Sequence, residues 1–258
     1  MNAALLTAGE LVMLLDSKQR RYLITLEDGA EFHSHSGFLA HIDIIGAVEG
    51  STLLSTRGAS YTVLRPTLGE FVLKMPRGAQ VIYPKDLGPL LLLADIGPGI
   101  RVFESGVGSG ALSMAMLRCG ASIVGYEIRE EFANRARANV ARFLGDDLLD
   151  RYQVELRDTY EGIDEVDVDR VVLDLPEPWE VVPHARTALR PGGIIASYSP
   201  SIIQVTRFRD ALDRAGFQLA ETIEVMHRGW HVEGQAVRPD HRMVGHTGFL
   251  TSARRVAN

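Results

Sequence analysis

A glycine-rich segment contains the residue types that are most specific to ligand binding in this sequence. Residues 104–112 are Glu-Ser-Gly-Val-Gly-Ser-Gly-Ala-Leu. Glycine lets the backbone turn tightly and approach a ligand closely, and a helix that starts there presents N–H groups to an anion. Gly106, Gly108 and Ala111 satisfy the pattern G-x-G-x-x-G/A of nucleotide-binding turns. A dinucleotide and S-adenosylmethionine (SAM) are therefore both candidate ligands.

Two glutamates bear on the choice between these ligands. Glu104 comes directly before the glycines, where it would face the cationic amino group of SAM and would repel the pyrophosphate of a dinucleotide. Glu127 ends the next expected strand, where its carboxylate would hydrogen-bond both ribose hydroxyls. An NAD-dependent enzyme uses an acidic residue in the same way. Glu104 thus favours SAM, while Glu127 leaves an NAD(P)-dependent oxidoreductase open.

A rigid acidic loop follows a later expected strand. Residues 174–179 are Asp-Leu-Pro-Glu-Pro-Trp, and the two prolines fix the backbone. Asp174 lies where doubly wound folds bind ligands, beyond the carboxyl ends of the strands. Its carboxylate could accept a hydrogen bond from the exocyclic amine of a flipped base. Trp179 could either stack on that base or pack at the start of a helix.

The elements that would hold these residues divide the chain in two. Short runs such as residues 21–26 and 60–65 alternate apolar with polar residues between glycine turns, so we expect a small β-rich domain over residues 1–75. Residues 76–258 alternate apolar runs with helical segments, which predicts an α/β fold with a mostly parallel sheet covered on both faces. The expected strands are 100–104, 122–127, 154–156, 170–173 and 194–198, and the expected helices are 111–118, 130–143, 178–189 and 202–215.

Composition and charge exclude several classes of protein. The chain is 46% hydrophobic and 23% charged, which rules out a disordered or fibrous chain. The apolar run Leu90–Ala94 is too short to span a bilayer, and the single Cys119 allows no intramolecular disulfide, so we expect a cytoplasmic protein. The net charge of −6 argues weakly against polyanion binding. Because residues 127–174 carry −7 and residues 175–258 carry +2, an RNA could still dock away from the acidic stretch.

Taken together, these residues resemble the tRNA (adenine-N1)-methyltransferases of the TrmI type, SAM-dependent enzymes that act on adenosine 58 of the TΨC loop. The resemblance covers nearly the whole chain, and an actinobacterial-like member is the nearest type. Besides the glycine segment and the Asp174 loop, it rests on residues 31–37 (Glu-Phe-His-Ser-His-Ser-Gly), 75–86 (Met-Pro-Arg-Gly-Ala-Gln-Val-Ile-Tyr-Pro-Lys-Asp) and 245–250 (Gly-His-Thr-Gly-Phe-Leu). The resemblance implies a class I Rossmann-like methyltransferase domain, a small N-terminal β-domain and a homotetramer.

The resemblance also implies the residues of the site. Asp174 would meet both the cofactor and the target adenine, and Tyr83 would position or stack the base unless it is a core residue beside Pro84. The chain departs from the family pattern at Val107 and at Phe132, where relatives often have a polar residue. The residues implied at the cofactor are Gln80, Gly106, Gly108, Ser109, Gly110, Ala111, Leu112, Glu127, Asp158, Thr159 and Asp174, to which the charge argument adds Glu104.

The expected partner is tRNA, and no metal is expected. Cations would contact phosphates without reading sequence. The candidates are Arg20, Arg21, Arg77, Lys85, Arg228, Arg238 and Arg242. The pair His33 and His35 lacks a third ligand, and the Gly-Trp between His227 and His231 disfavours a metal-bearing helix. A non-catalytic tRNA-binding subunit would keep the fold and lose the cofactor site, so the intact glycine segment argues against it.

Overall fold

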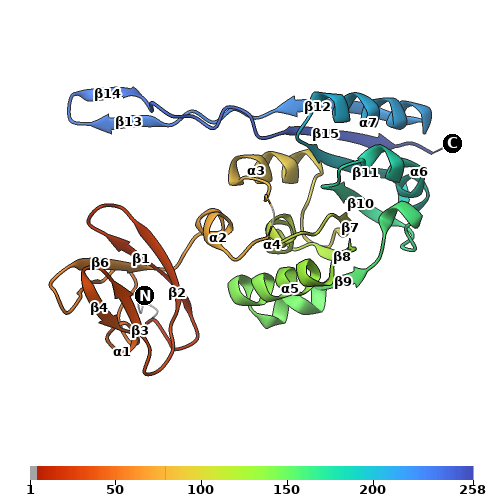
Figure 1. Cartoon of the computed structure of the whole chain (residues 1–258). Coiled ribbons are helices and arrows are strands. Elements are labelled where there is room, and N and C mark those ends of the chain that lie inside the picture. The colour runs from red at the N-terminus through yellow and green to blue at the C-terminus, as the bar shows by residue number, and fades with distance from the viewer. Residues whose placement is uncertain (1–4, 79, 258) are drawn as a thin grey trace. The chain divides into compact units, whose positions relative to one another are not determined.

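Two units, Met1–Met75 and Pro76–Asn258, make up the chain in the computed structural model, which describes residues 5–78 and 80–257 (Figure 1). Each unit has its own hydrophobic core. No helix in the described part of the chain has the length and apolar composition that crossing a membrane requires.

The first unit is built from short antiparallel strands, as its alternating sequence predicts. Its main sheet has the order β2-β1-β6-β5, and β3 pairs with β4 in a separate hairpin. The inward side chains form a core around Tyr61, whose ring packs edge-on against Tyr22 and Phe32. The elements are β1 (Leu11–Asp16), β2 (Arg21–Thr25), β3 (Glu31–Ser34), β4 (Gly37–Ala40), α1 (His41–Ile44), β5 (Thr52–Leu54), β6 (Ser60–Leu64) and α2 (Leu68–Lys74).

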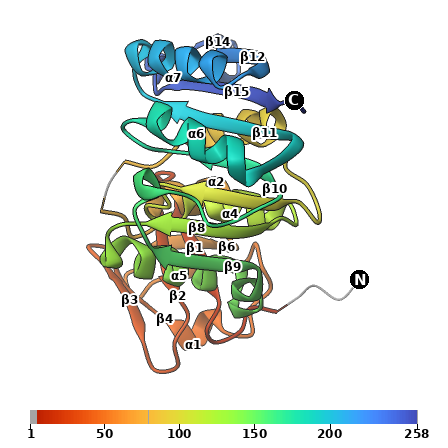
Figure 2. The same ribbon diagram turned by 90° about the vertical axis from the view of Figure 1, so that its right-hand side faces the viewer.

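A seven-stranded sheet of order β12-β15-β11-β10-β7-β8-β9 forms the centre of the second unit (Figure 2). Neighbouring strands from β11 to β9 are parallel, and β15 runs antiparallel between β11 and β12. This arrangement confirms the predicted α/β class and the mostly parallel sheet. The strands are β7 (Arg101–Ser105), β8 (Ser122–Glu127), β9 (Tyr152–Leu156), β10 (Val168–Leu173), β11 (Leu189–Ser199), β12 (Phe217–Glu224) and β15 (Phe249–Arg255), with a separate ribbon of β13 (Trp230–Glu233) and β14 (Ala236–Pro239).

Helices cover both faces of this sheet because the chain winds in two directions from β7. The strands β8 and β9 lie on one side of β7, and β10 and β11 lie on the other. Right-handed crossovers therefore place α4 and α5 on one face and α6 on the opposite face. The helix α3 packs against α4, and α7 packs against α6. The helices are α3 (Pro84–Leu93), α4 (Ala111–Arg118), α5 (Glu130–Leu144), α6 (Pro178–Ala188) and α7 (Ile202–Arg214).

The winding direction reverses between β7 and β10, which are adjacent in the sheet. The connections that leave these two strands diverge to opposite faces and open a crevice at the carboxyl ends of the strands. Doubly wound sheets bind their ligands at such a reversal. The glycine segment follows β7 and Asp174 follows β10, so the fold brings both to this crevice.

Candidate functional site

A cavity of about 330 Å³ opens at the carboxyl ends of β7, β8, β9 and β10. It brings together five residues that the sequence predicts at the site, one or two from each strand end. These five are Gly106, Glu127, Asp158, Thr159 and Asp174. The volume lies within the range of about 300–1,000 Å³ that is usual for small-molecule sites. The remaining lining residues are Ser105, Tyr126, Ile128, Arg129, Arg157, Tyr160, Leu175 and Pro176.

Gly106 lies where the glycine segment touches the Asp174 loop. The backbone N–H of Asp174 donates to the carbonyl oxygen of Ser105 at 2.9 Å, which holds the two loops together. Gly106 has a φ of +82°, and an added Cβ would lie 2.0 Å from the carbonyl oxygen of Asp174. A side chain at this position would therefore separate the loops, so the close approach requires glycine.

The carboxylate of Glu127 is held in place by backbone N–H groups. Gly108 N–H donates to Oε2 and Arg129 N–H donates to Oε1, each at 3.1 Å. The residue is 5% exposed and borders the cavity. Arg129 Nε also donates to Oε1 at 3.4 Å. Because a carboxylate has about four acceptor sites, these three bonds leave capacity for a ligand hydroxyl.

The rest of the glycine segment lies behind the cavity wall. Gly110 is the N-cap of α4, and Ala111 and Leu112 are buried in its first turn. Ser109 is 4% exposed, and its Oγ finds no hydrogen-bond partner among the described residues. Its carbonyl oxygen accepts a bond from the Asn139 side chain at 2.9 Å. An unpaired buried hydroxyl beside a ligand-binding turn fits a site that a polar ligand completes.

Glu104, which the sequence predicts at the cofactor, is 1% exposed in this structure. Its side chain does not line the cavity but lies in the protein interior, where Ser113 Oγ donates to Oε2 at 2.7 Å. Tyr152 in turn donates to Ser113 Oγ at 3.0 Å. Burial raises the pKa of Glu104 to about 8, and the charges of Asp174 and Glu127 act in the same direction. Glu104 therefore lies behind the glycine segment in this structure, and its contact with the cofactor stays a prediction.

Asp174 is the acidic group that reaches the cavity at the point where the strands reverse. The surrounding protein raises the pKa of its carboxyl to about 7, because little solvent is available to the ionised form. The Tyr160 hydroxyl accepts a bond of 3.2 Å from the Glu177 backbone N–H and so braces the same loop. Trp179 is partly buried against the hydrophobic core, with Arg207 over its ring, which favours the packing role.

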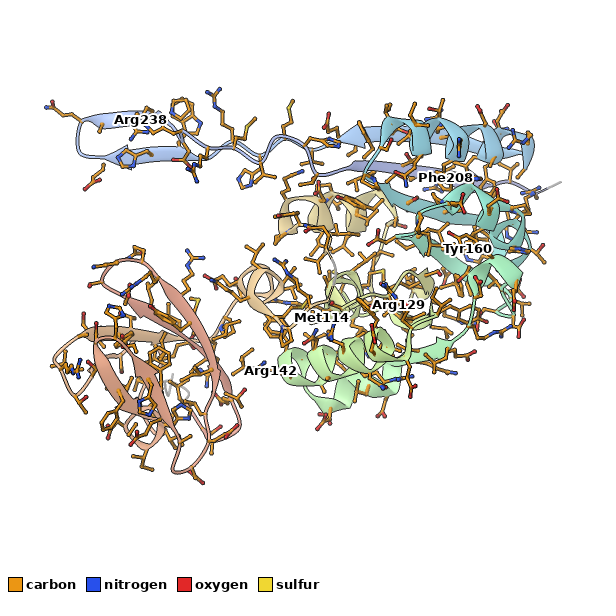
Figure 3. All side chains as sticks on the ribbon, viewed as in Figure 1. Met114, Arg129, Arg142, Tyr160, Phe208 and Arg238 are labelled. Atoms are coloured by element: carbon orange, nitrogen blue, oxygen red, sulfur yellow. The ribbon has the colours of Figure 1, made fainter. Side chains whose placement is uncertain are left out.

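Sequence reasoning missed five cavity residues that lie outside the glycine segment and the Asp174 loop: Tyr126, Ile128, Arg129, Arg157 and Tyr160. Ile128 directly follows Glu127 and is 67% exposed, which is unusual for an isoleucine at a strand end. That position, next to a recognised acidic residue, is the signal that could have identified it. Arg129 and Tyr160, labelled in Figure 3, come from the segments after β8 and β9. Arg129 lies over the ring of Phe132 at 3.7 Å, which keeps that ring in the interior and out of the cavity.

Gln80 and Tyr83 lie outside the lining of this cavity. Gln80 is exposed, and its amide donates to the carbonyl oxygen of Val81 at 3.3 Å. Tyr83 is half-buried at the N-terminus of α3. Burial raises the pKa of Tyr198 to about 12, and the charges of Asp174 and Asp86 act in the same direction.

The expected RNA-binding cations have different environments. Arg20 pairs with Asp16 at 2.6 Å and Arg21 pairs with Glu70 at 3.4 Å. The Lys85 side chain is only 7% exposed, which corrects its expected role as a phosphate contact. Exposed positions are occupied by Arg77, Arg228, Arg238 and Arg242, and Figure 3 shows Arg238 on the β13–β14 ribbon. Within residues 5–78 and 80–257, no three His, Cys, Asp or Glu side chains are grouped to hold a metal.

Comparison with known proteins gives matches over the length of this chain. The family described as "tRNA methyltransferase complex GCD14 subunit" matches residues 60–238, and "TrmI-like N-terminal" matches residues 5–53. The tRNA (adenine(58)-N(1))-methyltransferase TrmI of Thermus thermophilus is 35% identical over 247 residues, which cover 95% of this chain and 96% of that protein.

Two solved structures share the architecture. A SAM-dependent O-methyltransferase from Thermotoga maritima superposes with a TM-score of 0.92 at 31% identity, covering 98% of this chain and 95% of the other. The tRNA (m1A58) methyltransferase TrmI from Aquifex aeolicus gives a TM-score of 0.85 at 26% identity, covering 99% of this chain and all of the other (100%).

Proposed function

Because this chain belongs to the tRNA methyltransferase family of the GCD14 and TrmI-like proteins, we propose that it transfers a methyl group from SAM to N1 of adenosine 58 in the TΨC loop of tRNA. The observation that carries this proposal is the contact of the glycine segment with the Asp174 loop. Through that contact the glycine segment and the Asp174 loop lie side by side in the lining of one cavity.

The cavity residues fit SAM. Glu127 has acceptor capacity for the ribose. Asp158 and Thr159, which line the cavity, would flank the adenine ring, and Gly106 would let the methionine part approach the backbone closely. We assign supporting roles behind the wall to Gly108, Ser109, Gly110, Ala111 and Leu112, and assign Gln80 a cofactor contact from the family resemblance. When bound, SAM supplies an electrophilic methyl group on a sulfonium.

Asp174 performs the orienting step at the acceptor. Its ionised carboxylate accepts a hydrogen bond from the N6 amine of the flipped adenine, which aims N1 at the donor. The same negative charge stabilises the positive charge that the ring acquires on methylation. Holding donor and acceptor at near-attack distance contributes about 7–11 kcal/mol in favourable systems. From the family resemblance we assign Tyr83 the role of positioning or stacking the base.

Neither alternative gains support. An NAD(P)-dependent oxidoreductase would leave the Asp174 loop without a role, and the relatives reported above are named as methyltransferases. A non-catalytic RNA-binding subunit has no need of a cavity that joins Glu127, Asp158 and Asp174.

A methylation assay tests the proposal directly. Unmodified tRNA transcripts are incubated with the protein and labelled SAM, and the product nucleotide is mapped by mass spectrometry. We expect N1-methyladenosine at position 58, with calorimetric binding of SAM and none of NADH. Methyl transfer to a ribose or phosphate oxygen, or NADH binding without SAM binding, would overturn the proposal.

The assembly and location of the protein are part of the same proposal. The family resemblance implies a homotetramer, and the exposed apolar side chains Trp230, Val232 and Val237 of the ribbon are suited to burial between chains. Light scattering of the purified chain tests this assembly. A tRNA substrate supports a cytoplasmic location.

A further inference from the structure

Lys85 and Asp86 form a buried ion pair at the start of α3. Lys85 Nζ lies 2.8 Å from Asp86 Oδ1, and the two side chains are 7% and 0% exposed. A pair that is removed from water keeps its geometry only when further hydrogen bonds satisfy both partners. Two other segments of the chain provide these hydrogen bonds, one to Lys85 and one to Asp86.

These segments are the two ends of the excursion that carries the β13–β14 ribbon. Lys85 Nζ donates to the carbonyl oxygen of Val225 at 2.6 Å, directly after β12. Thr247 Oγ1 donates to Asp86 Oδ2 at 2.6 Å, shortly before β15. Figure 1 shows α3 beside the place where the ribbon leaves the sheet. The ion pair thus holds residues 226–246 at both ends.

Tyr198 extends this cluster toward the cavity. The Tyr198 hydroxyl donates to the carbonyl oxygen of Thr247 at 2.5 Å. Tyr198 directly follows Ser197, which pairs in the sheet with Leu173, the residue before Asp174. An added Cβ on Gly248 would lie 2.5 Å from Cζ of the Tyr198 ring, so this ring requires glycine at 248. The stretch 245–250 therefore has a structural purpose: Thr247 and Gly248 tie the ribbon to the strand next to Asp174.

We propose that Lys85, Asp86 and Thr247 form a positioning cluster that fixes the ribbon to the segment carrying Tyr83, so that RNA contacts on the ribbon present the target base to Asp174. This inference rests on the proposed function. A two-stranded ribbon is at best marginally stable by itself, so its direction must be set where it is attached. The exposed cations Arg228, Arg238 and Arg242 would supply the phosphate contacts, and the buried Lys85 would make none.

The Thr247→Val variant tests the cluster against Thr247→Ser. Valine keeps the shape and removes the hydroxyl donor to Asp86, whereas serine keeps the donor. We expect Thr247→Val to lower kcat for tRNA methylation about tenfold or more, because misplacements of about 1 Å can cost up to a hundredfold. The Kd for SAM should stay within about twofold of the wild type, since no cavity contact changes. Thr247→Ser should restore kcat, and a wild-type kcat in Thr247→Val would overturn the proposal.

Salt dependence distinguishes positioning from phosphate contact. The double variant Lys85→Met/Asp86→Asn removes both charges together and so leaves neither buried alone. We expect it to lower kcat while the slope of log Kd for tRNA against log salt stays unchanged, whereas Arg238→Met should reduce that slope by roughly one. If the double variant reduced this slope as much as Arg238→Met does, Lys85 would be a phosphate contact and the proposed cluster would be wrong.

Hydrogen exchange separates this inference from the proposed function. In Thr247→Val, amide exchange should rise in residues 83–87 and 225–248 and stay unchanged in β7 to β9. If the exchange changes in this way but the wild-type protein does not methylate tRNA, the cluster is retained and the proposed reaction is wrong. If exchange in residues 83–87 is unchanged in Thr247→Val and the wild-type protein methylates tRNA, only the proposed cluster is wrong.

Discussion

The backbone N–H of Asp174 donates a hydrogen bond of 2.9 Å to the carbonyl oxygen of Ser105. The parallel pairing of β7 with β10 reaches Leu173 opposite Ser105, so this bond continues the ladder one residue beyond the paired segment. Two loops that are 68 positions apart in the sequence, counted between Gly106 and Asp174, are thereby held in one register. The sheet therefore fixes the positions of Gly106 and Asp174 relative to each other at the cavity.

The substitution Gly106→Ala should break this register. Its Cβ would lie 2.0 Å from the Asp174 carbonyl oxygen, in a backbone conformation with φ of +82°. We expect the Kd for SAM to rise about tenfold or more, because the loops must separate. Titration calorimetry measures this change. Gly145→Ala is the matched control, since it has a φ of +94° and an added Cβ would meet no described atom within 4 Å. Equal SAM affinity in the two variants would contradict the role of Gly106.

Replacing the Asp174 carboxylate should lower the rate of methyl transfer more than it lowers the affinity for SAM. We expect Asp174→Asn to lower kcat by roughly 10²–10³, the effect typical of removing one electrostatic contact to a transition state. SAM affinity should change only a few-fold, because the bonds that fix Glu127 remain. Single-turnover kinetics with tRNA tests the expectation, and Glu177→Gln, exposed in the same loop, is the control. A kcat near that of the wild type would refute the assignment.

The raised pKa of Asp174 predicts how the rate depends on pH. Burial raises this pKa to about 7, so the carboxyl is largely protonated below that pH and cannot accept the adenine amine. We expect kcat/KM for SAM to rise with pH and level off above about 7, since this profile reports the free enzyme. A bound sulfonium cation favours the carboxylate, so the profile of kcat should lie at lower pH. Profiles without a rise in this region would exclude Asp174 as the titrating group.

Much of the fold follows from local sequence patterns. The helix Ala111–Arg118 and the strand Ser122–Glu127 have the bounds that periodicity predicts, because glycines or loop residues limit them on both sides. The cavity follows as well, since residues after parallel strands meet at one edge of a sheet. The sequence therefore predicts Glu127 and Asp174 at one site.

Other features depend on contacts that no local pattern encodes. The helix α3 contains Gly88 and Pro89, which have low helix propensity. The helix forms because tertiary packing overrides this low propensity. Glu104 lies in β7, where residues 102–105 are all buried, and its carboxylate accepts a hydrogen bond from Ser113 nine residues later. Lys85 resembles a surface cation in the sequence, whereas its partner Val225 lies more than a hundred residues away, as does Thr247, the partner of Asp86.

Ile128 should contribute to SAM binding without contributing to stability. It is 67% exposed on the cavity wall directly after Glu127, where an apolar side chain can pack on an adenine ring. We expect Ile128→Ala to weaken SAM binding roughly three- to tenfold, the value of one apolar contact of about 1 kcal/mol. The melting temperature without ligand should hardly change. Ile202→Ala on α7, 55% exposed and away from the cavity, should leave the Kd unchanged, and an equal effect of both variants would count against an adenine contact.

Glu104 should make the protein less stable as the pH rises. Its pKa is about 8 in the folded protein, against an ordinary value of 4.5, so the folded state binds more protons than the unfolded state between these values. The free energy of unfolding therefore falls as the pH increases through this window. Glu104→Gln retains an acceptor for Ser113 and has no charge, so it should melt several degrees above the wild type near pH 9, at roughly 2–4 °C for each 1 kcal/mol.

Melting curves recorded across the window test this expectation, with Glu131→Gln, exposed on α5, as the control. The raised pKa of Asp174 acts in the same direction, so a smaller decline with pH should persist in Glu104→Gln. That remainder should disappear in the double variant Glu104→Gln/Asp174→Asn. If Glu104→Gln and Glu131→Gln melted alike at every pH, the buried carboxyl of Glu104 would carry no charge cost, and its place behind the glycine segment would be wrong.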